Sequence, residues 1–227
     1  MTNIKERPIL FSAPMVRAIL EGRKTVTRRL VKDWQIPTED ASVAAGERHR
    51  WMAIAQRHPR YGFGVFGATE ADCAKELEDF APCPYGRRGE RLWVREAWAA
   101  DAQVDAVAPR DLSQGEPIRY PADGAVRQAG CSMITPGKGR PSIHMPRWAS
   151  RILLEITDVR VERLQDISEE QASAEGVSAQ AVESFRVAGV DRPAGFAFRD
   201  LWTSINGDEN WTVNPWVWVV EFKRVTP

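Results

Sequence analysis

Apolar residues near the start of the chain recur at the spacing of a helix. The residues that share one face of this helix are Met15, Val16, Ile19 and Leu20. Ser12 is a typical N-cap residue, Pro14 fits the first turn, and Gly22 fits the position just after the last turn. The pattern therefore predicts a short helix that ends where a basic run begins.

Runs rich in β-branched and aromatic residues predict four strands. The strongest, residues 151–164, contains neither glycine nor proline. The others are residues 25–31, the first half of 91–99, and the closing stretch 214–225. Strands are thus expected near the start, the middle and the end of the chain.

Further helices are predicted between these strands. Ser168 and Gln171 have the spacing of a capping box, and Gly176 marks the end of that short helix. Helical stretches are also expected near residues 70–80, 178–187 and 196–205.

Two long stretches lack a regular pattern. Residues 33–90 read as irregular apart from the helix near 70–80, and residues 100–142 are rich in loops. Since the elements show no βαβ rhythm, the expected fold class is α+β, a small antiparallel sheet or barrel flanked by short helices. We interpret residues 1–227 as a single domain with loop-rich insertions at about 33–85 and 100–142.

The composition is that of an ordinary globular protein. Of the 227 residues, 43% are hydrophobic and 27% are charged. No run approaches the roughly 20 apolar residues that span a bilayer, and the start lacks the apolar segment of a signal peptide. These features predict a cytoplasmic protein without a membrane partner.

The cysteines do not point to a metal site. Cys73, Cys83 and Cys131 are widely spaced and form no CxxC pair, so a zinc ribbon is not expected. His58 together with Cys73 and Cys83 would be the candidates for a metal, but ordinary thiols explain both cysteines equally well. We expect neither a metal nor a cofactor.

The zero net charge hides an asymmetry. Residues 1–60 contain twelve Lys and Arg against six Asp and Glu, a local excess of six positive charges. This segment indicates either a localised anion-binding site or a solvated basic face.

The basic run that follows Gly22 carries the residue types of a reactive site. A lysine such as Lys24 acts as a base when it is neutral, and a threonine hydroxyl such as that of Thr27 is a nucleophile when a base is near. On a regular strand the two side chains would lie on opposite faces. They converge only if the turn after Gly22 continues through Lys24.

Four stretches of the chain resemble the ASCH domain family, whose fold is PUA-like. The opening signature corresponds to Gly22, Lys24, Thr25, Thr27 and Arg28. The second stretch, residues 84–98, resembles a strand of the family through Gly89, Glu90, Leu92 and Val94. Residues 153–176 and 217–225 resemble its strand-then-helix segment and its closing strand. The chain is most similar to the long ASCH-like proteins of phages and prophages.

The resemblance implies a small β-barrel with a helix beside it and a cleft for a nucleotide or nucleic acid. Small bacterial relatives hydrolyse the acetyl amide of N4-acetylcytidine with a lysine, a threonine and a glutamate, which correspond here to Lys24, Thr27 and Glu175. Thr27 would attack the carbonyl, Lys24 would take and return the proton, and Glu175 would orient or activate the pair. Arg23 or Arg28 would hold a phosphate.

Two other activities stay open. Other relatives are proposed to bind or cut RNA, so the chain is expected to be an amidohydrolase, a non-catalytic reader of RNA or modified DNA, or an RNase. A base in the cleft would stack on Trp93, Trp98 or Trp148, although strand tryptophans are more typical of a core. Arg95 and Glu96 would read a base edge or pair with each other. No obligate protein partner is evident.

Overall fold

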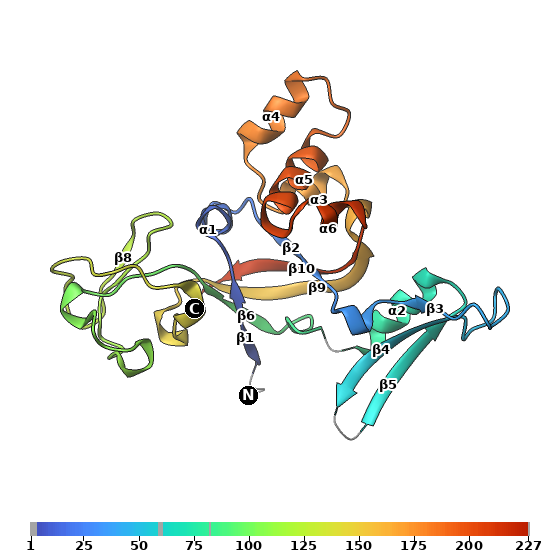
Figure 1. Ribbon diagram of the computed structural model, residues 1–227. Helices are drawn as coiled ribbons and strands as arrows, with labels where there is room; N and C mark the ends of the chain where they lie inside the picture. The colour runs from blue at the N-terminus through green and yellow to red at the C-terminus, as the bar shows by residue number, and fades with distance from the viewer. Residues whose placement is uncertain (1–3, 59–60, 82, 227) are drawn as a thin grey trace. The chain divides into compact units, whose positions relative to one another are not determined.

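The computed structural model describes residues 4–58, 61–81 and 83–226 (Figure 1). It divides into two units, and the division falls within two long strands, β9 (Leu153–Arg163) and β10 (Trp216–Val225). The first unit comprises residues 1–24, 89–155 and 223–227, and the second comprises residues 25–88 and 156–222.

The first unit is built on strands β1 (Glu6–Leu10) and β6 (Arg91–Arg95) and the start of β9. β1 pairs with β6 in parallel, and β6 pairs with β9 antiparallel, with Leu92 opposite Leu154. The predicted antiparallel sheet is therefore mixed. Strand β1 was not predicted, because proline and charged residues interrupt its short apolar pattern.

The predicted first helix is α1 (Ala13–Leu20). Ser12 occupies the N-cap position, but its side chain makes no capping hydrogen bond. Three of the four residues predicted for its buried face are buried. The fourth, Leu20, is half-buried, and Ala18 is buried as well.

The stretch 100–142 of the first unit is rich in loops, as predicted. It contains two short 3₁₀ turns and the two-residue strands β7 (Ile118–Arg119) and β8 (Val126–Arg127). A separate apolar cluster, which includes Trp98, Tyr120 and Met145, stabilises these loops. The four 3₁₀ turns of the unit are Ala102–Val104, Pro109–Asp111, Ser142–His144 and Arg147–Ala149.

In the second unit, β2 (Val26–Leu30) pairs antiparallel with β10, and Val219 lies opposite Arg28. Val26, Val217 and Val219 pack with Phe198 and Trp202 in one apolar core. Helices supply most of that core. They are α3 (Glu169–Ala174), α4 (Ala179–Val187), α5 (Pro193–Asn206) and α6 (Asp208–Thr212), preceded by the 3₁₀ turn η6 (Leu164–Asp166). α6 was not predicted.

The interpretation of residues 33–90 as irregular was wrong. They form a hairpin of β4 (Trp51–His58) and β5 (Tyr61–Gly67), and the predicted helix is α2 (Glu70–Phe80). Glycines break up the apolar pattern of β5 and make it look like a loop. Gly67 is required, since a Cβ there would lie 2.3 Å from the backbone nitrogen of Cys73. The stretch also contains a 3₁₀ turn (Asp33–Gln35) and the strand β3 (Thr38–Glu39).

The described elements confirm the α+β class but not the barrel. The strands of the described residues form an open five-stranded sheet, a three-stranded sheet and a two-stranded sheet. The PUA-like barrel stays a prediction of the resemblance. Among the described residues, no helix has both the length and the apolar character needed to cross a membrane.

Candidate functional site

The turn after Gly22 continues through Lys24, which is the condition stated above for Lys24 and Thr27 to converge. Gly22 adopts a left-handed backbone with φ of 75°, which closes helix α1. The N–H groups of Arg23 and Lys24 both donate to the carbonyl of Ala18, at 2.8 and 3.0 Å. The turn therefore continues through Lys24, and the regular strand begins only at Val26.

A charged network surrounds Arg28 in the second unit. The guanidinium is fully buried, and its Nη1 lies 3.3 Å from Oε1 of Glu175. Its Nη2 lies 2.7 Å from Oε1 of Gln171 and 3.2 Å from Oε2 of Glu162. The Phe198 ring covers the guanidinium at 5.9 Å. Arg28, predicted to hold a phosphate, is thus occupied by two carboxylates and an amide oxygen.

Helix α3 positions Glu175 at its end. The predicted capping box is confirmed, because the Ser168 side chain accepts from the N–H of Gln171 and the Gln171 side chain accepts from the N–H of Ser168. Gln171 accepts from Arg28 through the same oxygen. Glu175 is the C-cap residue. One side chain therefore serves both the start of the helix and the charged network beside its end.

A backbone hydrogen bond ties the basic run to the same helix. The N–H of Thr25 donates to the carbonyl of Ala174 at 2.9 Å. Ala174 directly precedes Glu175, and Thr25 directly follows Lys24. Segments about 150 residues apart in the sequence are joined there.

The three predicted catalytic residues are all buried. The exposed fractions are 3% for Lys24 and 4% for Thr27 and Glu175. Lys24 ends the first unit, with its Nζ 5.7 Å from the centre of the Phe11 ring. Thr27 and Arg28 are successive strand residues, so their side chains point to opposite faces of β2.

Two of the predicted substrate-binding residues in the first unit are packed against cations. Arg95 lies 4.6 Å from the centre of the Trp93 ring, and Trp93 is 7% exposed. Trp98 is fully buried, with Arg140 at 5.3 Å from its ring. In this structure neither ring presents an open face for a base, and both have the surroundings of core tryptophans.

Glu96 pairs with Arg151 rather than with Arg95. The two Glu96 oxygens accept from Arg151 at 2.8 and 2.9 Å. Burial of the carboxyl raises the pKa of Glu96 above its usual value, although the hydrogen bonds from Arg151 act in the opposite direction. Arg151 also reaches Asp123 and lies 4.0 Å from the centre of the Tyr120 ring. The Glu96 carboxylate is therefore part of a structural network.

Several arginines of the basic segment 1–60 are paired with acids. Ion pairs join Arg7 to Glu90 in the first unit, and Arg48 to Glu76 in the second. Arg23 pairs with its neighbour Glu21 at 2.8 Å on the surface. The charge excess seen in the sequence thus does not amount to a free anion site at these arginines.

Cys73 and Cys83 belong to no metal-binding group among the described residues. The side chain of His58 lies outside the described residues, while Cys73 and Cys83 are buried. Within the described part of the chain, no group of three His, Cys, Asp or Glu is arranged to hold a metal ion. Burial raises the pKa of the Cys73 thiol to about 11, and Glu76 and Glu70 add to the effect.

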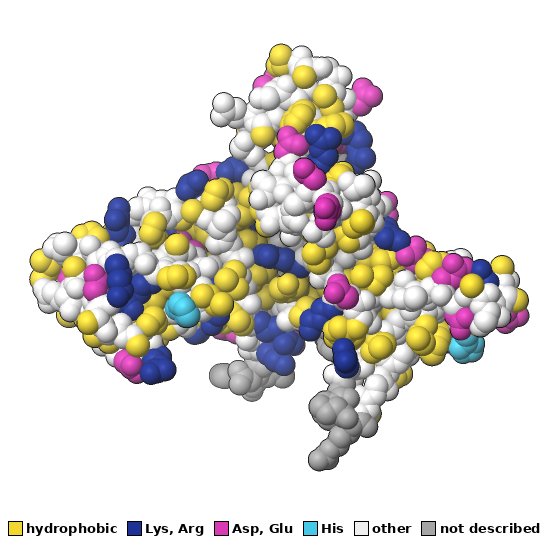
Figure 2. Space-filling view, in the orientation of Figure 1, with side chains coloured by type: hydrophobic (Ala, Val, Ile, Leu, Met, Phe, Trp, Pro, Cys, Tyr) yellow, Lys and Arg dark blue, Asp and Glu magenta, His cyan; other side chains and the backbone are white. Residues whose placement is uncertain are grey.

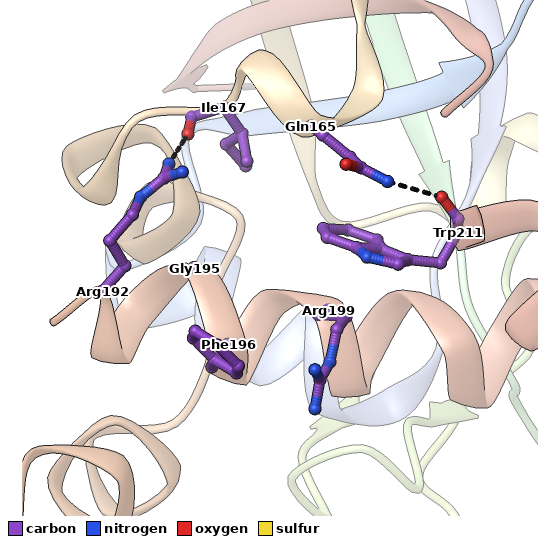
Figure 3. A pocket seen from close by; sticks show the side chains of 7 residues that line it. All are labelled: Gln165, Ile167, Arg192, Gly195, Phe196, Arg199 and Trp211. Atoms are coloured by element: carbon purple, nitrogen blue, oxygen red, sulfur yellow. Dashed lines mark hydrogen bonds between the residues drawn. The ribbon is translucent and has the colours of Figure 1, made fainter. Parts of the chain in front are cut away.

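A pocket in the second unit contains none of the predicted residues (Figure 3). Its volume is about 190 Å³, and it lies among the turn η6 and helices α5 and α6. Phe196 and Arg199 are three residues apart on α5, a spacing that places them on one helix face, and Arg192 is the N-cap residue just before the helix. This arrangement of arginine and phenylalanine residues was the signal in the sequence from which the pocket could have been predicted. The lining residues are Gln165, Ile167, Arg192, Gly195, Phe196, Arg199 and Trp211.

Comparison of the chain with protein-family models, with curated proteins and with solved structures found no match.

Proposed function

We propose that this protein binds a nucleoside or modified base and hydrolyses the amide of an N4-acylated cytosine. The observation that carries the proposal is the burial of Lys24, Thr27 and Glu175, each less than 5% exposed. Burying an ionisable group such as that of Lys24 or Glu175 costs roughly several kcal/mol unless its partners compensate. Buried ionisable groups are therefore candidates for function. The same three residues match the catalytic set of the N4-acetylcytidine amidohydrolases that the sequence resembles.

The proposed reaction has two balanced steps. The Thr27 oxygen forms a bond to the amide carbonyl carbon while neutral Lys24 takes the hydroxyl proton. The C–N bond then breaks, Lys24 returns the proton to N4, and an acyl ester remains on Thr27. Water attacks this ester with Lys24 again as base, which releases a carboxylic acid and restores the threonine.

Within this proposal, Arg28 is a positioning residue. It holds the carboxylate of Glu175 at 3.3 Å, and its other contacts, to Gln171 and Glu162, fix the guanidinium. Glu175 in turn would orient the lysine and threonine. A phosphate on the substrate would need another partner, because Arg28 is already neutralised.

A second function, non-catalytic reading of RNA or modified DNA, is favoured by one specific observation. Thr27 and Arg28 are successive residues of β2, so the Thr27 side chain lies on the opposite face of the strand from the guanidinium that contacts Glu175. A reader requires only recognition of the base and has no turnover to lose. An RNase using the same basic run would instead cleave a polymer.

Release of cytidine from N4-acetylcytidine, followed by chromatography, tests the proposal. The wild-type protein should release cytidine, Lys24→Ala should not, and Lys32→Ala, which changes an exposed lysine nearby, should behave as wild type. Absence of release by folded wild-type protein would overturn the hydrolase. Labelled RNA and DNA would then separate binding without cleavage from cleavage.

A further inference from the structure

The pocket on α5 combines cationic and aromatic side chains from three elements. Phe196 comes from the first turn of α5 and Arg192 is the N-cap residue before it, while Gln165 comes from the turn η6 and Trp211 from α6. Figure 3 shows the Trp211 ring lying across the pocket, with Arg192 at one end. Over the α4–α5 region of Figure 2, dark blue and yellow side chains lie side by side. Arg199 lies 4.8 Å from the centre of the Phe196 ring.

Arg192 is the cationic side chain of this pocket that is best suited to bind an anionic ligand. One of its Nη atoms donates to the carbonyl of Ile167, and within the described residues it forms no ion pair. Arg199, by contrast, is paired with Asp200 at 3.2 Å. Since a guanidinium binds a carboxylate or phosphate through two parallel hydrogen bonds, Arg192 retains donors that suit an anion.

The anion would not be held by the start of the helix. The Glu169 carboxylate already accepts from the N–H groups of Ala194 and Gly195, at 2.9 and 2.7 Å. Those two backbone donors are therefore occupied, and a negative charge placed there would meet the glutamate. Recognition of an anion in this pocket depends on the side chain of Arg192.

The remaining groups suit a planar ring. Trp211 is half-buried and presents an aromatic surface, and aromatic rings stack on such surfaces. Gln165 donates from Nε2 to the carbonyl of Trp211 at 2.7 Å, which fixes the amide and leaves its Oε1 as an acceptor. A volume of about 190 Å³ suits one small ring system with its substituent.

We propose that this pocket is a second ligand site, for a planar aromatic ring that carries a carboxylate or phosphate. The ring stacks on Trp211, Gln165 accepts a hydrogen bond from the ring, and Arg192 binds the anion. None of these residues belongs to the set proposed for catalysis. The two proposed sites can therefore be tested independently of each other.

Isothermal titration calorimetry with four kinds of probe tests this site. The probes are cytidine and adenosine 5′-monophosphates, the two parent nucleosides, indole-3-carboxylate, and inorganic phosphate. A ring with its anion should bind at least about tenfold more tightly than the nucleoside or phosphate alone, as expected when a charge-assisted hydrogen bond is added. The monophosphates and the carboxylate distinguish the two sources of the anion.

Two variants locate the binding. Arg192→Gln should weaken binding of the preferred probe about tenfold or more. Arg186→Gln, which changes an exposed arginine on α4, should leave it unchanged. Phe196→Ala tests whether the Phe196 ring, which lines the pocket, contributes to binding. Because this side chain is 37% exposed, its removal does not open the core. Thermal unfolding of each variant verifies its fold.

Three results would overturn the proposal. They are no binding of any probe, equal binding by Arg192→Gln and wild type, and binding that Glu175→Gln abolishes but Arg192→Gln does not. The last would place the ligand at the other site. Cytidine release from N4-acetylcytidine is measured on the same variants, so failure of this pocket and failure of the hydrolase are distinguishable.

Discussion

Arg28 and Glu175 form an ion pair with Nη1 and Oε1 3.3 Å apart, although 147 residues separate them in the sequence. Side-chain exposure is 0% for Arg28 and 5% for Glu175. A pair so deeply buried is expensive to desolvate, and removing one partner leaves the other charge uncompensated. The relationship links the basic run on β2 to the end of α3.

Replacing Arg28 by methionine should therefore destabilise the protein strongly. The change leaves Glu175 buried without its guanidinium, for which the expected loss is about 3–5 kcal/mol of unfolding free energy. Urea denaturation measures it. The matched control is Arg23→Met, which removes the surface pair with Glu21 and should cost about 0–1 kcal/mol. Equal losses in the two variants would show that the buried pair contributes no more than a surface one.

Much of the fold was predictable because its signals are local. The helix before Gly22, the capping box at Ser168 and the strand 153–163 each follow from neighbouring residues. The hairpin β4–β5 was not, since glycines interrupt the apolar pattern of β5 and the need for one of them, Gly67, arises only from the close approach of α2. Whether such a strand forms depends on contacts with a partner that is distant in the sequence.

The candidate site was less predictable than the fold. The basic run identified Arg28 as important, but its role depends on partners that only the tertiary structure reveals, Glu162 and Glu175. Similarly, Glu96 pairs with Arg151 instead of its neighbour Arg95. Charge along a sequence indicates where ion pairs will form without indicating which residues form them.

If the amidohydrolase proposal holds, the hydroxyl of Thr27 is essential and its methyl group is not. Thr27→Val preserves the shape of the side chain but removes the nucleophile, so cytidine release should fall at least about a thousandfold. Thr27→Ser retains the nucleophile and should keep measurable turnover. Initial rates with N4-acetylcytidine decide the matter. Full activity of the valine variant would exclude Thr27 as the nucleophile.

The loops of residues 100–142 should respond to acid through Asp101. Its carboxylate accepts from the backbone N–H groups of Gln103, Thr135 and Ile134, at 3.1, 3.0 and 2.7 Å. These hydrogen bonds, with that from Gln103 the largest cause, lower the pKa of Asp101 below its usual 3.8. The unfolded chain then binds the proton more readily than the folded chain. The stabilisation is complete above about pH 4 and is lost as the pH falls through the folded-state pKa.

Denaturation midpoints between about pH 2 and pH 6 test this expectation. Asp101→Asn removes the titrating group, so its stability should fall less steeply with acid than that of the wild type. Asp111→Asn serves as the control, because Asp111 is exposed and its sequence neighbour Arg110, with which it pairs, is exposed as well. Parallel curves for Asp101→Asn and the wild type would contradict the assignment.

The three cysteines should differ sharply in reactivity. Cys131 is exposed, whereas Cys73 and Cys83 are buried. The Sγ of Cys73 lies 3.7 Å from the carbonyl of Val65, and burial raises its pKa to about 11. Only about one Cys73 thiol in a thousand would be ionised at pH 8, and the thiolate is the reactive form.

Titration with a chromogenic disulfide reagent at pH 8 should therefore show one fast thiol in the native protein. Cys131→Ser should abolish that fast phase, and all three thiols should react in denaturant. A fast phase that persists in Cys131→Ser would come from Cys73 or Cys83. If it comes from Cys73, which lies on α2 and contacts Val65 of β5, it would mean that the β4–β5 hairpin opens from α2. Cys73→Ala combined with Cys131→Ser then identifies the source: loss of the remaining phase assigns it to Cys73, and its persistence assigns it to Cys83.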